Sequence, residues 1–364
     1  MAISAETGVS IEAENTLIIF DEIQEVPKAL TSLKYFHENA PQYAIVAAGS
    51  LLGVALHQGT SFPVGKVDFL DLYPLNFREF LCAMGEKQFV SMLDSCDTQM
   101  VTVFKTKYIE RLREYYFVGG MPEVVKDFSE KKDYNRVRVI QKNLINYYQQ
   151  DFSKHAEIKL VPRLNLVWNS IPMQLAKENK KYIYGQVRKG SRAKDFELAI
   201  QWLLDCGLIH KVQRIQKPDL PLKAYIDFDA FKLFLVDIGL LIAMTDLDAK
   251  VIIEGNKIFT EFKGALTEQY ILQQLISDVG VIPYYYSTQN SKGEIDFLVQ
   301  GKTSVIPIEV KAEENLKAKS LKAFCEKYQP SYAVRTSMSD YREQDWMTNI
   351  PLYAIKWIEN YVNQ

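Results

Sequence analysis

Three charged residues in the carboxyl-terminal part of the chain have the spacing of a small polar site. Residues 294–299 and 305–311 alternate apolar and polar side chains, which predicts two strands joined by a hairpin loop. The alternation places Glu309 and Lys311 on one face of the second strand, and hairpin pairing brings Asp296 of the first strand beside them. One surface would then hold two carboxylates and one ammonium group, which are residue types that metal-dependent hydrolysis uses.

An aspartate followed by Glu-x-Lys on the neighbouring strand resembles the site of the PD-(D/E)xK nuclease superfamily. The resemblance implies that Asp296 and Glu309 bind Mg²⁺ and that Lys311 positions or deprotonates the attacking water. It also implies that Glu268, on a helix predicted over residues 262–275, is an outer metal ligand. The alternative is an inert charge pair on a shared scaffold, because a fold does not fix a function.

A second pair of acids follows an apolar run in the amino-terminal part of the chain. Residues 16–20 are apolar and lead into Asp21 and Glu22, the pattern of a buried parallel strand that delivers acids to its carboxyl end. Residues 27–39 have helical spacing, and residues 44–48 form a second apolar run. Strand, helix and strand predict one right-handed βαβ unit.

Several segments resemble P-loop ATPases of the AAA type that carry a carboxyl-terminal domain of unknown function. They are LIIFDEIQ at 17–24, AAGS at 47–50, SFPVGKVDFLDLYPLNFREFL at 61–81 and YYFVGGMPEVV at 115–125. The resemblance implies that Asp21 holds Mg²⁺ through water, that Glu22 orients the water attacking the γ-phosphate, and that Ser50 senses this phosphate. ATP and Mg²⁺ are therefore the implied cofactors.

The glycine-rich loop that such ATPases use to bind phosphate, GxxxxGK followed by Ser or Thr, is absent from the sequence. Gly65-Lys66 is followed by Val67, and Gly301-Lys302-Thr303 has Asp296 where the first glycine would stand. Only 15 residues precede Thr16, too few for a strand, the loop and a helix. We therefore expect a truncated ATPase lobe that does not hydrolyse ATP by itself.

The middle of the chain predicts a winged helix, a helix-turn-helix variant that docks on DNA. Its elements would be a strand at 182–187, a helix at 191–206 and paired strands at 208–215 and 222–229. Residues 180–217 contain nine basic residues against three acidic ones.

Four of these basic residues are the candidate DNA contacts: Arg188, Lys189, Arg192 and Lys194. Because the net charge of the chain is −2, a local patch of this kind must carry any affinity for nucleic acid. The alternative is the solvated face of a spacer or of a surface that binds a protein partner.

Composition places the chain among ordinary globular proteins, with 48% hydrophobic and 24% charged residues. No secretion signal is recognisable, and the longest candidate span, residues 43–56, has 14 residues against the ~18 to 20 that a membrane requires. The four cysteines and four histidines show no zinc-site spacing. We expect a cytoplasmic protein without a membrane segment, capable of forming a homo-oligomer.

These observations predict an α/β protein of three parts. They are a truncated P-loop AAA-type lobe at 1–95, a helical and winged-helix region at 96–235, and a restriction-endonuclease-like α/β domain at 236–364. The first functional hypothesis is an incomplete AAA-family ATP-binding protein that binds nucleic acid, with DNA as the expected nucleic acid. The second is a Mg²⁺-dependent DNA nuclease that uses Asp296, Glu309 and Lys311, and the third is a non-catalytic interaction module.

Overall fold

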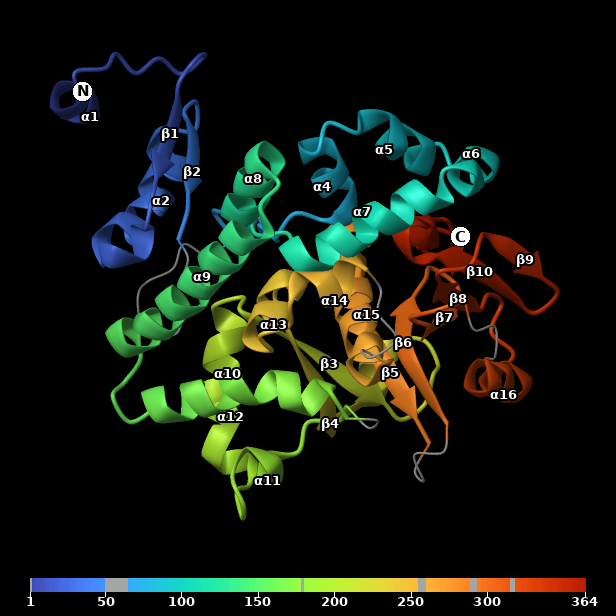
Figure 1. Ribbon diagram of the computed structural model, residues 1–364. Coiled ribbons are helices and arrows are strands. Elements are labelled where there is room, and N and C mark those ends of the chain that lie inside the picture. Colours follow the sequence, from blue (N-terminus) through green and yellow to red (C-terminus); the bar gives the residue numbers. More distant parts are fainter. Residues whose placement is uncertain (1, 50–64, 178–179, 255–259, 289–292, 315–317) are drawn as a thin grey trace. The chain divides into compact units, whose positions relative to one another are not determined.

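The computed structural model describes residues 2–49, 65–177, 180–254, 260–288, 293–314 and 318–364 (Figure 1). The chain forms two compact units, one made of Met1–Leu72 with Ile200–Leu208 and the other of Tyr73–Ala199 with Ile209–Gln364. Within the described parts, no helix has both the length and the apolar composition that a membrane span needs.

The first unit contains a small parallel sheet. Strands β1 (Leu17–Phe20) and β2 (Ala44–Ala47) pair in parallel and are connected by helix α2 (Pro27–Asn39), which confirms the predicted strand, helix and strand. The rings of Phe20 and Phe36 lie 5.8 Å apart, so α2 packs on this sheet. A short helix, α1 (Ala2–Thr7), precedes the sheet.

Helices make up the middle of the chain. They are α4 (Phe77–Ala83), α5 (Lys87–Asp94), α6 (Thr98–Val103), α7 (Lys105–Val118), α8 (Pro122–Lys131), α9 (Tyr134–His155), α10 (Val161–Leu175), α11 (Tyr184–Val187) and α12 (Ala193–Asp205).

The strand predicted at 182–187 is wrong, because α11 occupies most of it. Only Tyr182 keeps an extended-chain contact, in which its N–H donates to the Phe231 carbonyl oxygen at 2.8 Å. One such bond does not make a strand, and Tyr184 begins the helical turn instead.

The second unit is built on an eight-stranded mixed sheet with the order β4-β3-β5-β6-β7-β8-β10-β9 (Figure 1). The strands are β3 (Ile209–Ile215), β4 (Ile226–Leu235), β5 (Tyr284–Ser287), β6 (Glu294–Gln300), β7 (Val305–Val310), β8 (Val334–Ser337), β9 (Arg342–Gln344) and β10 (Met347–Pro351). The helices around it are α13 (Ile238–Met244), α14 (Ala249–Ile253), α15 (Thr260–Gln274), α16 (Lys319–Tyr328) and α17 (Glu359–Val362), and a π-helical turn, Leu275–Val279, continues α15.

Strands β3 and β4, which correspond to the predicted wing, pair antiparallel as expected but belong to this large sheet. β3 also pairs in parallel with β5, where Arg214 lies opposite Tyr285. The pairing of β3 and β4 shifts register between Gln213 and Arg214. These two strands therefore do not form a wing that projects from a separate small domain.

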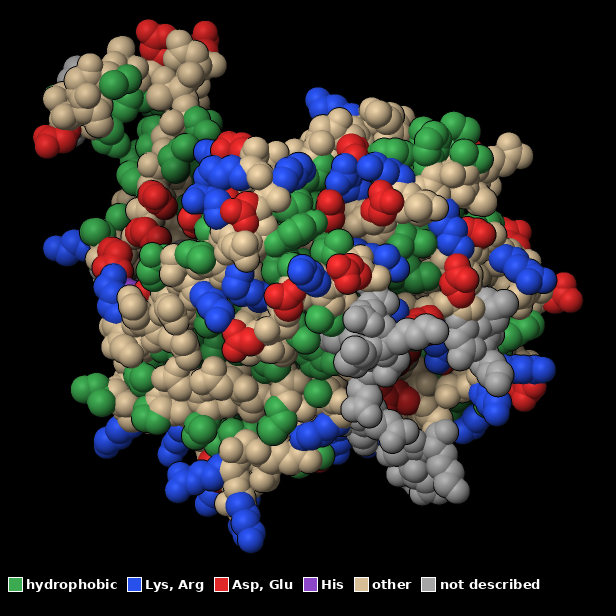
Figure 2. All heavy atoms as spheres, in the orientation of Figure 1, with side chains coloured by type: hydrophobic (Ala, Val, Ile, Leu, Met, Phe, Trp, Pro, Cys, Tyr) green, Lys and Arg blue, Asp and Glu red, His purple; other side chains and the backbone are tan. Residues whose placement is uncertain are grey.

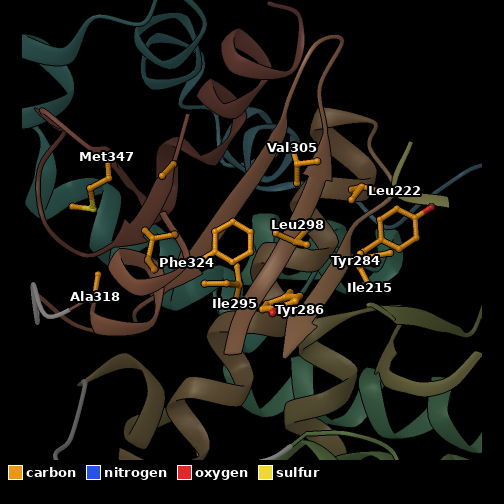
Figure 3. Packing of buried hydrophobic residues seen from close by; sticks show 12 residues of the cluster. Ile215, Leu222, Tyr284, Tyr286, Ile295, Leu298, Val305, Ala318, Phe324 and Met347 are labelled. Carbon is orange, nitrogen blue, oxygen red and sulfur yellow. The ribbon is translucent and has the colours of Figure 1, made fainter. Parts of the chain in front are cut away.

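One apolar cluster fills the space between α16 and the sheet (Figure 3). Leu321 and Phe324 of α16 belong to it, together with Tyr286 of β5 and with Ile295 and Leu298 of β6. The Phe324 and Tyr286 rings meet edge to face at 5.5 Å. This packing holds the hairpin of β6 and β7, on which the candidate site is built.

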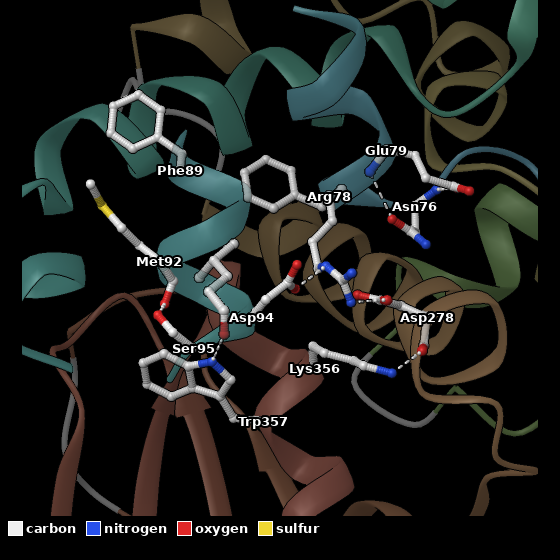
Figure 4. Close-up of polar contacts among 12 residues, drawn as sticks. Asn76, Arg78, Glu79, Phe89, Met92, Asp94, Ser95, Asp278, Lys356 and Trp357 are labelled. Carbon is white, nitrogen blue, oxygen red and sulfur yellow. Dashed lines mark hydrogen bonds and ion pairs between the residues drawn. The ribbon is translucent and has the colours of Figure 1, made fainter. Parts of the chain in front are cut away.

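The helical middle is attached to the carboxyl-terminal segment by polar contacts (Figure 4). Arg78 of α4 forms ion pairs with Asp94 of α5 and with Asp278 of the π-helical turn, both at 3.0 Å. The Trp357 indole N–H donates to the Leu93 carbonyl oxygen at 2.7 Å. Helices from a distant part of the sequence therefore hold the π-helical turn after α15 and the segment that follows β10.

Candidate functional site

A β-bulge positions Asp296. Tyr284 of β5 lies opposite Leu298 of β6, whereas Tyr286 lies opposite Ile295, so β6 has one residue more than β5 across this stretch. Such a bulge bends the strand and redirects a side chain, and bulges are common beside functional sites. Here the redirected residue is Asp296 or its neighbour Phe297.

The Asp296 carboxylate connects β6 to β7. Regular pairing between the two strands runs from Gln300 opposite Val305 to Phe297 opposite Ile308. Beyond that pair, the Val310 N–H donates to Asp296 Oδ2 at 2.7 Å. The side chain thus satisfies a backbone donor, and the same hydrogen bond fixes the position of the carboxylate.

Glu309 and Lys311 lie next to this carboxylate. Lys311 Nζ is 2.6 Å from Glu309 Oε1, and the Lys311 side chain is 31% exposed. Glu309 itself is only 5% exposed, and every residue of β7 is buried. The expected surface location of Glu309 is therefore wrong, because β7 is an inner strand between β6 and β8 with both faces covered.

The clustered carboxylates influence one another. Burial raises the pKa of Asp296 well above its usual range, and the neighbouring Glu268 and Glu309 charges raise it further, while Lys232 and Lys180 act in the opposite direction. Like charges gathered in a region of low dielectric disfavour ionisation, and a bound cation relieves that repulsion. Glu268 lies on α15, which corresponds to the helix predicted for it. It is thus close enough to interact with Asp296.

Two lysines that the sequence did not assign to the site take part in it. Lys180 Nζ forms an ion pair with Glu268 Oε1. Lys232 Nζ lies 3.6 Å from Glu268 Oε2 and 2.5 Å from Glu294 Oε1. Burial raises the pKa of Glu268, but the two ammonium groups outweigh it and hold this pKa below its ordinary value.

Lys232 left a signal in the sequence that could have been used. It stands within an apolar run of β4, and its side chain is 0% exposed. A lysine is almost never fully buried unless it is paired, so a lone lysine in a buried strand predicts an internal carboxylate partner. Lys180 left no such signal, because it was one of several basic residues in its segment.

The donor chemistry of the site fits a hard divalent cation in part. Carboxylate oxygens are ligands that Mg²⁺ prefers, and Glu309 Oε2 is buried without a hydrogen-bond partner among the described residues. Glu268, in contrast, is already bound by two ammonium groups. In the described parts of the chain, no group of three or more His, Cys, Asp or Glu side chains could hold a metal ion. Asp296 and Glu309 are therefore the described carboxylates whose surroundings fit a Mg²⁺ ion. The ligand role of Glu268 stays a prediction.

The four candidate DNA contacts lie together at the surface. Arg188 and Lys189 follow α11, and Arg192 and Lys194 flank the first residue of α12. All four are exposed, and none forms an ion pair with a residue that the structure describes. Figure 2 shows Lys and Arg side chains gathered at the lower left of that face, over α11.

Other basic residues of the same segment are engaged in pairs. Arg214 binds Asp227 and Lys217 binds Asp219. Lys211 Nζ lies 4.4 Å from the centre of the Phe231 ring. The basic surface is therefore smaller than the sequence count indicated.

In the first unit, Asp21 and Glu22 follow β1 directly, as predicted, and both are exposed. Asp21 Oδ1 accepts a hydrogen bond from the Glu22 N–H at 3.0 Å, and Glu22 accepts one from the Gln24 side chain. Ser50, the predicted phosphate sensor, lies outside the described residues.

Comparison with known families divides the chain into three segments. Residues 3–81 match the family model of an AAA domain. The amino-terminal part of the chain is an AAA domain. Residues 109–251 match a domain of unknown function, DUF8612, and residues 263–355 match another, DUF4143. No curated protein and no solved structure matches the chain.

The family boundaries cross the candidate site. Asp296, Glu309, Lys311 and Glu268 lie within the DUF4143 match. Lys180 lies within the DUF8612 match, as does Lys232. The ion pairs of Glu268 therefore connect two segments that sequence families treat separately.

Proposed function

We propose that the segment spanning residues 263–355 is a Mg²⁺-dependent phosphodiesterase that acts on nucleic acid, with DNA as the expected substrate. The observation that supports this function is the placement of Asp296, at the β6 bulge, beside the Glu309–Lys311 pair. Two carboxylates and an ammonium group in that order along the chain also resemble the PD-(D/E)xK pattern.

Each residue would have a distinct role in such a reaction. A Mg²⁺ ion held by Asp296 and Glu309 would supply a bound water of lowered pKa and stabilise the charge on the scissile phosphate. The hydrogen bond from Val310 N–H keeps the Asp296 carboxylate in place. Lys311 is partly exposed and pairs with Glu309. Its ammonium group can contact the phosphate or orient the attacking water.

Two further parts of the proposal rest on other regions. Arg188, Lys189, Arg192 and Lys194 would contact the phosphate backbone of DNA, because exposed and unpaired basic groups supply the sequence-independent part of such binding. The AAA domain would bind ATP and Mg²⁺ through Asp21, Glu22 and Ser50, as its family implies.

The test is cleavage of plasmid and single-stranded DNA by the full chain in Mg²⁺ or Mn²⁺. We expect the wild type to cleave and both Asp296→Asn and Lys311→Met to lose cleavage by at least 100-fold, about 2.7 kcal/mol. Lys302→Met is the matched control, because Lys302 is exposed in the turn between β6 and β7 and should leave cleavage unchanged. A wild type that is folded but inert, or variants that cleave as well as the wild type, would reject the proposed function.

The ion pairs of Glu268 favour a second candidate, a nucleic-acid-binding module without catalysis. In that case the two lysines would neutralise the carboxylates permanently. DNA binding that persists with no cleavage in either metal would support this candidate over the first.

A further inference from the structure

The charged groups around Asp296 are nearly balanced without any metal. Four carboxylates take part, those of Glu268, Glu294, Asp296 and Glu309. Three ammonium groups face them, those of Lys180, Lys232 and Lys311. The buried Arg335 guanidinium also interacts with Glu309, so with all eight groups ionised the cluster has no net charge.

A divalent cation would upset this balance. Its arrival would raise the net charge from 0 to +2, and the departure of one ammonium group would lower the excess to +1. A buried excess charge is costly in a medium of low dielectric. We therefore expect one lysine ammonium group to move out of the cluster when the metal ion binds.

Lys180 is the lysine that can leave. The Lys232 side chain is 0% exposed, and its ammonium group is held by Glu294 at 2.5 Å and lies 4.8 Å from the centre of the Tyr285 ring. The Lys180 side chain is 14% exposed, and its ammonium group forms an ion pair with Glu268 alone among the described carboxylates. Tyr182, two residues further along the chain, is anchored to β4 by its N–H, so a change of the Lys180 rotamer can suffice.

We propose that Lys180 is an internal counter-cation that occupies Glu268 in the metal-free site and gives way when a divalent cation binds. This inference rests on the proposed function of the same site. It assigns Lys180 a regulatory role: the ammonium group lowers metal affinity and keeps Glu268 from acting as a ligand until the metal competes for it. It also explains why the described carboxylates do not form a three-ligand group.

The experiment is calorimetric titration of the full chain with Mn²⁺ in the absence of nucleic acid. Lys180→Met removes the ammonium group and keeps the length of the side chain, and we expect it to bind Mn²⁺ at least ten-fold more tightly than the wild type, about 1.4 kcal/mol. Lys180→Arg, which keeps the charge, is expected to bind within about two-fold of the wild type. Lys159→Met is the matched control, because Lys159 is exposed and makes no ion pair with a described residue.

Circular dichroism of each variant checks that it is folded, and Lys180→Gln replaces Lys180→Met if the latter unfolds. Binding that is tighter in Lys180→Met and lost in the double variant with Asp296→Asn supports the proposal. If Lys180→Met binds no more tightly than the wild type while Asp296→Asn still abolishes binding, the counter-cation role is overturned and the proposed function stands. If no folded variant binds Mn²⁺, both are overturned.

Discussion

Gly119 and Gly190 have similar φ angles but different surroundings. Their φ angles are 75° and 82°, in the left-handed region that disfavours a side chain. A Cβ atom on Gly119 would stand 2.3 Å from Asp237 Oδ1, whereas one on Gly190 would meet nothing within 4 Å. Asp237 is fully buried, accepts a hydrogen bond from the Gly120 N–H at 2.6 Å and caps α13. The glycine pair after α7 therefore makes room for a buried carboxylate.

We predict that Gly119→Ala lowers the free energy of unfolding by about 3 kcal/mol or more, because backbone strain and a steric clash add. The matched control, Gly190→Ala, has backbone strain alone and should cost about 1 kcal/mol. Urea denaturation of both variants measures the two values. Equal losses of unfolding free energy in the two variants would show that a side chain at position 119 does not clash with Asp237.

His210 of β3 makes stability depend on pH. Burial disfavours the charged imidazolium and lowers the pKa of His210 from 6.5 to about 4. Because the folded-state pKa is depressed, the unfolded chain binds the proton first as the pH falls below about 6.5. Stability associated with His210 is therefore present at pH 7 and is lost as the pH falls toward 4.

We predict that proton uptake by His210 in the unfolded chain lowers the free energy of unfolding of the wild type by about 2 kcal/mol as the pH falls from 7 to 5. In His210→Gln the change over the same interval should be smaller by that amount, since no proton is taken up at this position. Urea denaturation at the two pH values tests the difference. An identical pH dependence in the two proteins would contradict the burial of the imidazole.

At the scale of elements, local patterns predicted the strands of the site but not the bulge between them. The alternation in residues 294–299 and 305–311 was sufficient for β6 and β7, and both strands are confirmed. The bulge depends on how β5 pairs with β6, and nothing in β6 alone specifies that register. The burial of Glu309 was missed for a related reason, because strand position within a sheet is not a local property.

The basic segment around α11 permits a test at this scale. We predict that replacing its four exposed basic residues with alanine weakens DNA binding and reduces the slope of log K against log salt by about 2 to 4, since each lost phosphate contact removes about 0.9. The residues are Arg188, Lys189, Arg192 and Lys194.

The control for this variant removes an equal number of exposed lysines from around the β6–β7 turn and α16. These are Lys302, Lys319, Lys322 and Lys327. Fluorescence anisotropy with a labelled duplex at several salt concentrations measures both slopes. If the control loses as much of the slope as the α11 variant, the effect comes from net charge and not from this surface.

At the scale of the whole molecule, the sequence predicted the small parallel sheet of the AAA domain and the helical middle. It did not predict that β3 and β4 join the strands of the carboxyl-terminal segment. The pairing of Arg214 with Tyr285 joins residues that are far apart in the chain, and such contacts leave no trace in a local pattern. The boundaries predicted at residues 95 and 235 stay predictions, whereas the predicted wing is wrong because its strands belong to the large sheet.

The shared sheet has an evolutionary consequence. β3 and β4 fall in the DUF8612 match and β5 to β10 in the DUF4143 match, yet β3 and β5 are hydrogen-bonded neighbours. Recombination between the two segments would leave an unpaired strand edge on each product, and unpaired edges promote aggregation. It would also separate Lys180 and Lys232 from Glu268. We therefore expect the two segments to be inherited together, with compensating substitutions on both sides of the junction.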